Sequence, residues 1–165
     1  MKLIVHLVYA ILLLAFIASC EQKKRSNAEL VVMELPHWSL AALEAPAFKN
    51  SYDFDTSINP FYLTLDIDGN CSMDMAAVVV EKASGRRGIA LLHHESDSAL
   101  VFGAGNPNTF GGINWNWLVG WKAEERLTAG AKVSAHKGTA LILYTETSGA
   151  NWMYWNGKEW EWVAQ

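Results

Sequence analysis

The chain has 165 residues, of which 51% are hydrophobic and 12% aromatic, and it contains 8 tryptophans. A chain of this length has room for one domain with one hydrophobic core. Its formal net charge is -4 and it has no basic stripe, which argues against a nucleic acid as partner.

The first 20 residues have the features of an export signal. A basic start at 1–2 is followed by an apolar run at 3–16 and by small residues before Cys20. The run is shorter than the ~20 apolar residues that a membrane helix needs, so we predict a signal peptide over 1–19. Its end resembles the lipobox of bacterial lipoproteins. The resemblance implies cleavage before Cys20, with diacylglycerol on the thiol and a fatty acyl group such as palmitate on the amine. An ordinary signal peptide or an uncleaved anchor helix is the alternative.

The segment after the cysteine is polar and charged, and we interpret 20–27 as a lipidated cysteine with a flexible tether. In lipoproteins an Asp after the cysteine tends to retain the protein in the inner membrane. Glu21 stands here, so the resemblance implies a lipid anchor in the outer membrane of the cell envelope. Residues 28–165 are predicted to form a single globular domain. With Cys20 acylated, Cys71 has no partner for a disulfide within the chain, so the hydrophobic core must stabilise the fold.

The first part of this domain mixes short elements. Ser39 is a plausible N-cap for a short helix, which Pro46 ends. The elements predicted here are an edge strand at 28–35, a helix at 40–44, a loop at 48–59 and a strand at 61–65.

Further strands follow. The runs at 75–80 and 88–94 are apolar on both faces, which is typical of central strands covered on both sides. We expect 110–127 to be irregular and then extended. The remaining predicted strands lie at 99–102 and 139–144. The predicted fold class is mainly β, or α+β in the broad sense: an antiparallel sheet with one short helix and a Trp-rich hairpin at the C-terminus.

That hairpin is predicted from Asn156-Gly157, a pair that favours a two-residue type I′ turn. The strand alternation then puts Met153, Trp155, Trp160 and Trp162 on one face, which we expect to be core. The other face is expected to be half exposed. On it we place a candidate binding patch for a glycan or a protein, because Trp and Tyr are favoured anchors at interfaces. The alternative is that the tryptophans simply fill the core. The predicted patch consists of Trp152, Tyr154, Glu159 and Glu161.

The segment 66–74 is an acidic loop that runs into an apolar strand. Its oxygen-bearing side chains could supply most of the six to eight oxygens that calcium binds. The loop is not an EF-hand, because Cys71 and Ala77 stand where that loop needs Gly and Glu. It is similar to the D-x-D-G-[DN]-G-x-x-D loop of FG-GAP and VCBS repeats, with Cys71 in place of the second Gly. The resemblance implies a structural calcium ion. The predicted ligands are the side chains of Asp66, Asp68, Asn70 and Asp74 and the carbonyl group of Ser72. The alternative is a turn whose side chains cap backbone N–H groups.

The sequence contains no persuasive catalytic set. Neighbouring residues of a strand point to opposite faces, so His93 and His94 are not expected to share a metal ion. We therefore favour a lipid-anchored envelope protein with a non-catalytic domain that binds a protein or a glycan. One alternative is a periplasmic inhibitor or immunity protein. The other is an envelope glycan hydrolase, which needs paired carboxylates; its candidates are Asp53, Asp55 and Glu95.

Overall fold

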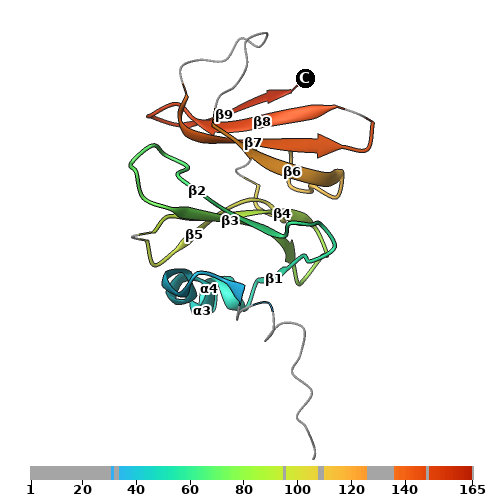
Figure 1. Cartoon of the computed structure of the whole chain (residues 1–165). Coiled ribbons are helices and arrows are strands. Elements are labelled where there is room, and N and C mark those ends of the chain that lie inside the picture. The colour runs from blue at the N-terminus through green and yellow to red at the C-terminus, as the bar shows by residue number, and fades with distance from the viewer. Residues whose placement is uncertain are drawn as a thin grey trace, which may run out of the picture.

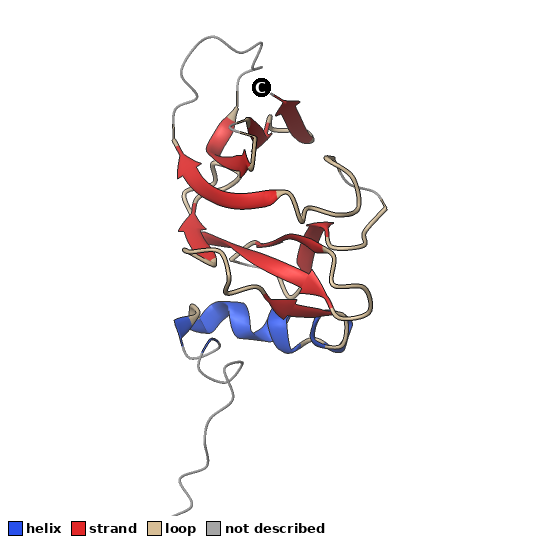
Figure 2. Cartoon of the chain, turned by 90° about the vertical axis from the view of Figure 1, so that its right-hand side faces the viewer, coloured by secondary structure: helices blue, strands red, loops and turns tan. Residues whose placement is uncertain are grey.

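The computed structural model describes residues 31, 34–94, 96–107, 110–125, 136–147 and 149–164. They form three layers, with helices at the bottom, a five-stranded sheet in the middle and a four-stranded sheet at the top (Figure 1). Figure 2 shows the same layers from the side. Both sheets are antiparallel, so the mainly β prediction is confirmed. Among the helices in the described part of the chain, none is long and apolar enough to cross a membrane.

The helical layer consists of the 3-10 turn η1 (His37–Ser39) and the helices α3 (Leu40–Glu44) and α4 (Pro46–Lys49). Ser39 precedes α3, but its hydroxyl donates to the Pro36 carbonyl at 2.7 Å instead of capping the helix. Pro46 ends α3 as predicted and then begins α4, because its fixed φ suits a first helical position. There are therefore two short helices where one was expected.

The middle sheet, sheet A, is built around β3. Strand β3 pairs with both β1 and β2 on one side and with β4 on the other. The residues of β3 from Asp74 to Val79 are buried, because the helices cover one face of the sheet and the second sheet covers the other. The predicted two-sided burial is thereby confirmed, whereas β1 lies where a loop was expected. Sheet A comprises β1 (Tyr52–Phe54), β2 (Tyr62–Leu65), β3 (Asp74–Glu81), β4 (Arg87–Leu92) and β5 (Ala99–Gly103).

The upper sheet, sheet B, contains β6 (Leu118–Glu124), β7 (Lys137–Thr145), β8 (Ala150–Trp155) and β9 (Trp160–Ala164), in chain order. The predicted hairpin is β8–β9, but Trp155 pairs with Trp160, so four residues rather than two form the turn. The Asn156 side chain accepts the N–H groups of Lys158 and Glu159 at 2.8 and 2.9 Å, which stabilises this longer turn. A register shift of two residues leaves the predicted faces unchanged.

The three layers enclose two hydrophobic cores among the described residues, where one was expected, because sheet A is covered on both faces. The larger one lies between the sheets, and the smaller one lies between sheet A and the helices. The first includes Ile67, Val78, Ile89, Leu91, Trp115, Leu118, Leu141, Leu143 and Met153, with Trp160 and Trp162 packed against it. The second includes Leu43, Phe48, Met75, Val79, Ala90, Leu92 and Val101.

Several N-terminal predictions fall outside the described residues: the signal peptide at 1–19, the lipidated Cys20 and the tether at 20–27. Of the edge strand expected at 28–35, the structure describes Val31, Glu34 and Leu35. Val31 and Glu34 are helical, so the strand prediction is wrong at these two positions.

Candidate functional site

The acidic loop joins β2 to β3, and Asp66 organises its backbone. One carboxylate oxygen of Asp66 accepts the N–H groups of Gly69 and Asn70 at 2.8 and 3.1 Å, and the other accepts that of Cys71 at 2.9 Å. Cys71 has a φ of 67°, so it adopts the left-handed conformation that the similar repeats reach with Gly. The loop thus keeps a tight shape although a cysteine stands at this position, and the Cys71 side chain is exposed.

The next polar residues of the loop also bind backbone groups. Asp68 accepts the backbone N–H of Asn70 at 3.1 Å and its side-chain NH₂ at 3.3 Å. Asn70 in turn accepts the N–H of Ser72 at 2.7 Å. These contacts match the predicted alternative, in which short polar side chains satisfy the turn. The five predicted calcium ligands are not gathered around one point in this arrangement, because Asp66 does not belong to the group that Asp68 and Asp74 form. Calcium binding by all five stays a prediction that requires the loop to rearrange.

Asp74 begins β3 and is fully buried. Its carboxylate accepts the N–H of Ile67 at 3.1 Å and, through the other oxygen, the N–H of His94 at 2.9 Å. Burial alone raises the pKa of Asp74, but the neighbouring His93 imidazole and the two N–H groups lower it more, so the net shift is downward. Asp74 is therefore a carboxylate held ionised inside the protein.

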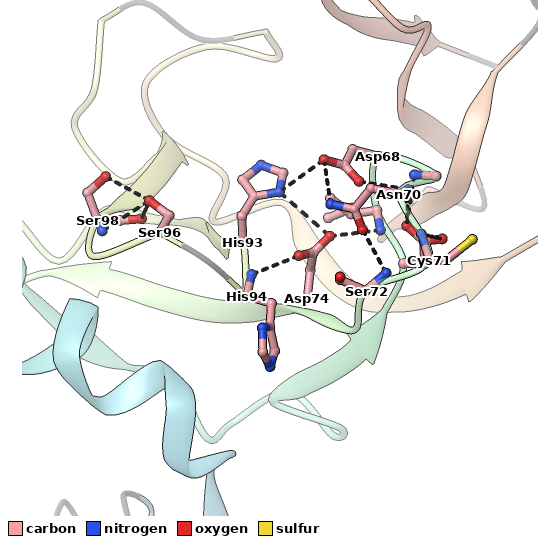
Figure 3. A network of polar contacts seen from close by, with 12 residues as sticks. Asp68, Asn70, Cys71, Ser72, Asp74, His93, His94, Ser96 and Ser98 are labelled. Atoms are coloured by element: carbon pink, nitrogen blue, oxygen red, sulfur yellow. Dashed lines mark hydrogen bonds and ion pairs between the residues drawn. The ribbon is translucent and has the colours of Figure 1, made fainter.

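His93 follows β4 and turns its ring toward the loop, as Figure 3 shows. Its Nδ1 atom lies 3.6 Å from Oδ2 of Asp68 and 3.6 Å from Oδ2 of Asp74. The Asp74 carboxylate raises the pKa of His93, burial opposes this shift, and the charge of Asp68 adds to the rise. His94 points the other way and packs on Trp38, with ring centroids 4.9 Å apart, so the opposite orientation of the two histidines is confirmed.

The grouping of His93 with Asp68 and Asp74 was missed by the sequence reading. Among the described residues, the metal-ligating atoms of these three lie within 4.8 Å of one another, and Asp66 is not a member of the group. The register of β3 with β4 is the signal from which the contact of His93 with Asp74 could have been predicted. Met75 lies opposite Leu92, so Asp74 and His93 are the next residues outward on the two strands.

A cleft of about 140 Å³ opens beside this group, lined by Asp68, His93, Trp155 and Trp160. Its walls come from both sheets, because the acidic loop and His93 belong to sheet A and the tryptophans belong to the β8–β9 hairpin. Trp155 and Trp160 pair across that hairpin with ring centroids 5.6 Å apart, and Trp160 also packs edge-on against Phe102 at 5.6 Å. The cleft is thus lined by two aromatic side chains from one sheet and two polar side chains from the other.

A backbone contact holds the acidic loop against sheet B. The N–H of Thr139 donates to the Asp66 carbonyl at 2.7 Å. Beside it, Gly138 and Gly69 approach so closely that a Cβ on Gly138 would lie 2.5 Å from the Gly69 nitrogen. Both glycines have positive φ, of 67° and 77°. Only glycine fits this crossing without strain, so the wall of the cleft is fixed by local backbone packing.

The candidate patch on the last hairpin is not a single exposed surface. Tyr154 is fully buried, so the expectation that its ring is exposed is wrong. Its hydroxyl donates to Glu161 at 2.6 Å, and Glu161 also accepts the side-chain NH₂ of Asn156 at 2.5 Å. Trp152 is half-buried and Glu159 is exposed on the turn. The hairpin instead contributes its other face, through Trp155 and Trp160, to the cleft.

The carboxylates considered for hydrolysis lie elsewhere. Asp53 forms an exposed ion pair with Lys82 at 3.3 Å. Asp55 is bound by the Arg87 guanidinium at 2.6 Å. Glu95 lies outside the described residues. Neither Asp53 nor Asp55 lines the cleft.

No protein-family model matches this chain, and no curated protein and no solved structure matches it with significant similarity. The resemblances to bacterial lipoproteins and to FG-GAP and VCBS repeats therefore stay predictions, and the function has to be argued from the geometry of the site.

Proposed function

We propose that the chain is a lipid-anchored protein of the bacterial cell envelope whose domain binds a glycan in the cleft, without catalysing a reaction. The anchor is supported by the apolar-small-small-Cys pattern that ends at Cys20. The binding role is supported by one observation, the cleft lined by Trp155 and Trp160 together with Asp68 and His93.

The chemistry of the cleft suits a sugar. An indole ring offers a broad apolar surface on which the C–H face of a sugar ring can stack. Asp68 can accept hydrogen bonds from hydroxyl groups, and an imidazole can donate or accept one. Ligand pockets combine such apolar walls with a few polar groups that fix orientation. At about 140 Å³ the cleft is smaller than the ~300–1,000 Å³ of pockets for drug-sized ligands, so it suits a single terminal sugar unit.

A glycan hydrolase is less well supported. Hydrolysis needs two carboxyl groups that both reach the scissile bond. Asp74 lies near Asp68, but its side chain is 1% exposed and both of its oxygens accept backbone N–H groups. Asp55 is held by Arg87 away from the cleft. A periplasmic inhibitor or immunity protein stays the alternative within the binding class, and the binding experiment separates it.

The anchor is tested by metabolic labelling with radioactive palmitate in a bacterial host, followed by membrane fractionation. The wild-type chain is expected to carry the label and to sediment with outer membranes. A Cys20→Ser variant is expected to lose the label. Equal labelling of the variant, or release of the wild type into the soluble fraction, would contradict the anchor.

Binding is tested by titrating the full-length chain in detergent with peptidoglycan fragments and other envelope oligosaccharides, with tryptophan fluorescence as readout. Trp155→Ala is expected to weaken binding at least about tenfold, because the stacking wall is lost. The matched control is Trp152→Ala, half-buried on the same strand but on the opposite face. An equal loss of glycan affinity in Trp155→Ala and Trp152→Ala would contradict glycan binding. So would a chain that responds to no glycan but binds a protein through Trp155.

A further inference from the structure

From the arrangement of Asp68, Asp74 and His93 we infer that these three side chains bind a divalent transition-metal ion of the zinc type. The inference does not depend on glycan binding, although Asp68 and His93 belong to both sites. It also differs from the calcium prediction in its ligand set, because it uses an imidazole and leaves out Asp66 and Asn70.

The first argument is the state of the imidazole nitrogen. Nδ1 of His93 is buried, and by distance it makes no hydrogen bond among the described residues; the Asp68 and Asp74 carboxylates face it as ion-pair partners. Buried polar atoms are nearly always paired, and an exception calls for an explanation such as a bound ion. Two carboxylate oxygens lie 3.6 Å from this nitrogen, beyond the ~2.7–3.2 Å of an N–H···O hydrogen bond.

The second argument is that this spacing matches shared coordination. Nitrogen and oxygen ligands lie about 2.0–2.2 Å from zinc in a near-tetrahedral arrangement, which places two ligand atoms about 3.3–3.6 Å apart. The two distances from Nδ1 of His93, to Asp68 and to Asp74, are both 3.6 Å. The three ligating atoms together lie within 4.8 Å of one another. Two of the three ligand separations therefore match shared coordination, and on binding the two carboxylates would adjust to each other.

The third argument is the type and support of the ligands. One imidazole with two carboxylates is a nitrogen and oxygen set that suits zinc, whereas calcium takes oxygen ligands. Backbone N–H groups orient Asp74, and both nitrogens of Asn70 donate to Asp68. Hydrogen bonds of this kind hold ligands in place around metals. Asp68 and His93 also line the cleft, so a remaining coordination position adjoins it.

The experiment is calorimetric titration of the full-length chain, stripped with chelator and kept in detergent, with zinc chloride and separately with calcium chloride. We expect one zinc ion per chain and a rise in the melting temperature with zinc. His93→Gln and Asp68→Asn are expected to weaken zinc binding at least about tenfold. The matched control is His94→Gln, which removes the neighbouring imidazole on the opposite face and should leave zinc affinity unchanged.

Asp74 is not used as the test residue, because its removal leaves the backbone N–H groups of Ile67 and His94 without their acceptor and can unfold the chain. Circular dichroism in chelator checks that His93→Gln and Asp68→Asn fold. Bound cobalt gives a second readout, since its visible absorption should be present in the wild type and in His94→Gln but lost in His93→Gln. Failure of the wild type to bind zinc, or equal zinc binding by the wild type and His93→Gln, would each overturn the inference.

Discussion

Strand β4 carries a charged cluster at each end, and the two clusters differ in how fully their polar atoms are paired. At its first residue, the Arg87 guanidinium donates to Asp55 at 2.6 Å, to the Leu118 carbonyl at 2.9 Å and to the Ser57 hydroxyl at 3.2 Å. The Arg87 and Asp55 side chains are only 20% and 11% exposed. This cluster joins sheet A to the start of β6 in sheet B, and its donors and acceptors match.

Just beyond the last residue of β4, the second cluster brings His93 to Asp68 and Asp74. Here Nδ1 of His93 is buried without a hydrogen bond, and two carboxylates face it at 3.6 Å. A fully satisfied buried network stabilises one structure, whereas a partly satisfied one is costly unless something completes it. The contrast indicates that the Arg87 cluster serves the fold, and it supports the inference of a metal ion at the His93 cluster.

The largest expected effect on stability comes from breaking the Arg87 cluster. Arg87→Leu should lower the free energy of unfolding by about 3 kcal/mol, because it leaves the Asp55 carboxylate and the Leu118 carbonyl without their cation. Urea unfolding measures this loss. Arg86→Leu is the matched control and should stay within about 0.5 kcal/mol of the wild type. Equal losses in Arg87→Leu and Arg86→Leu would show that the contacts of the Arg87 cluster do not contribute to the free energy of unfolding.

The next largest effect concerns the close contact between the acidic loop and sheet B. Gly138→Ala should cost about 2 kcal/mol, since the new Cβ meets Gly69 at a backbone already in the left-handed region. Gly85→Ala separates the two causes, because Gly85 has a φ of 69° but open space around it. That control should cost only about 1 kcal/mol from backbone strain. Thermal and urea unfolding measure both, and equal costs would mean that the crossing of the loop with sheet B is not tight.

The parts of this fold that depend on the hydrophobic pattern could be predicted from the sequence. The apolar runs became β3 and β4, buried on both faces, and the alternation in the last hairpin correctly placed Met153, Trp160 and Trp162 against the core. Trp155, expected in the core with them, is half-buried and lines the cleft instead. The turn length could not be predicted, because it depends on how the Asn156 side chain binds two N–H groups. Strand β1 has only three residues and is held by pairing with β3, so its own sequence carries little signal.

The site was predictable only in part, for a different reason. The acidic residues stand together in the chain, so the loop itself was found. His93 lies about twenty residues further on, and it joins Asp74 only through the register of β3 with β4. The burial of Tyr154 was missed because alternation alone assigned it to a half-exposed face. Contacts that rest on register are long-range, and a local pattern does not encode them.

A smaller effect, dependent on pH, is expected at Asp55. Burial raises the pKa of Asp55, but hydrogen bonds from Ser57 and the Arg87 guanidinium lower it more, so the net shift is downward. A lowered folded pKa stabilises the protein above the ordinary carboxyl pKa of about 4, and this stabilisation is lost as the pH falls through the lowered value. Asp55→Asn should therefore cost about 1.5 kcal/mol at pH 7 and progressively less in acid. Asp53→Asn, at the exposed pair with Lys82, is the control and should differ from the wild type by less than about 0.5 kcal/mol at pH 7. A constant difference for Asp55→Asn between pH 7 and acid would contradict the assignment.

The smallest effect on stability is expected at His93, in the second cluster. In chelator at neutral pH, His93→Gln should lower the free energy of unfolding by about 1 kcal/mol, less than Arg87→Leu, because the half-exposed imidazole is lost but the two backbone N–H groups that bind Asp74 remain. With zinc added, the wild type should gain stability as the ratio of free zinc to its dissociation constant rises, while His93→Gln should gain little. Urea unfolding with and without zinc measures both quantities on the same two proteins. A loss in chelator as large as that of Arg87→Leu would mean that His93 stabilises the fold as Arg87 does. The His93 cluster would then be a structural cluster like the Arg87 cluster.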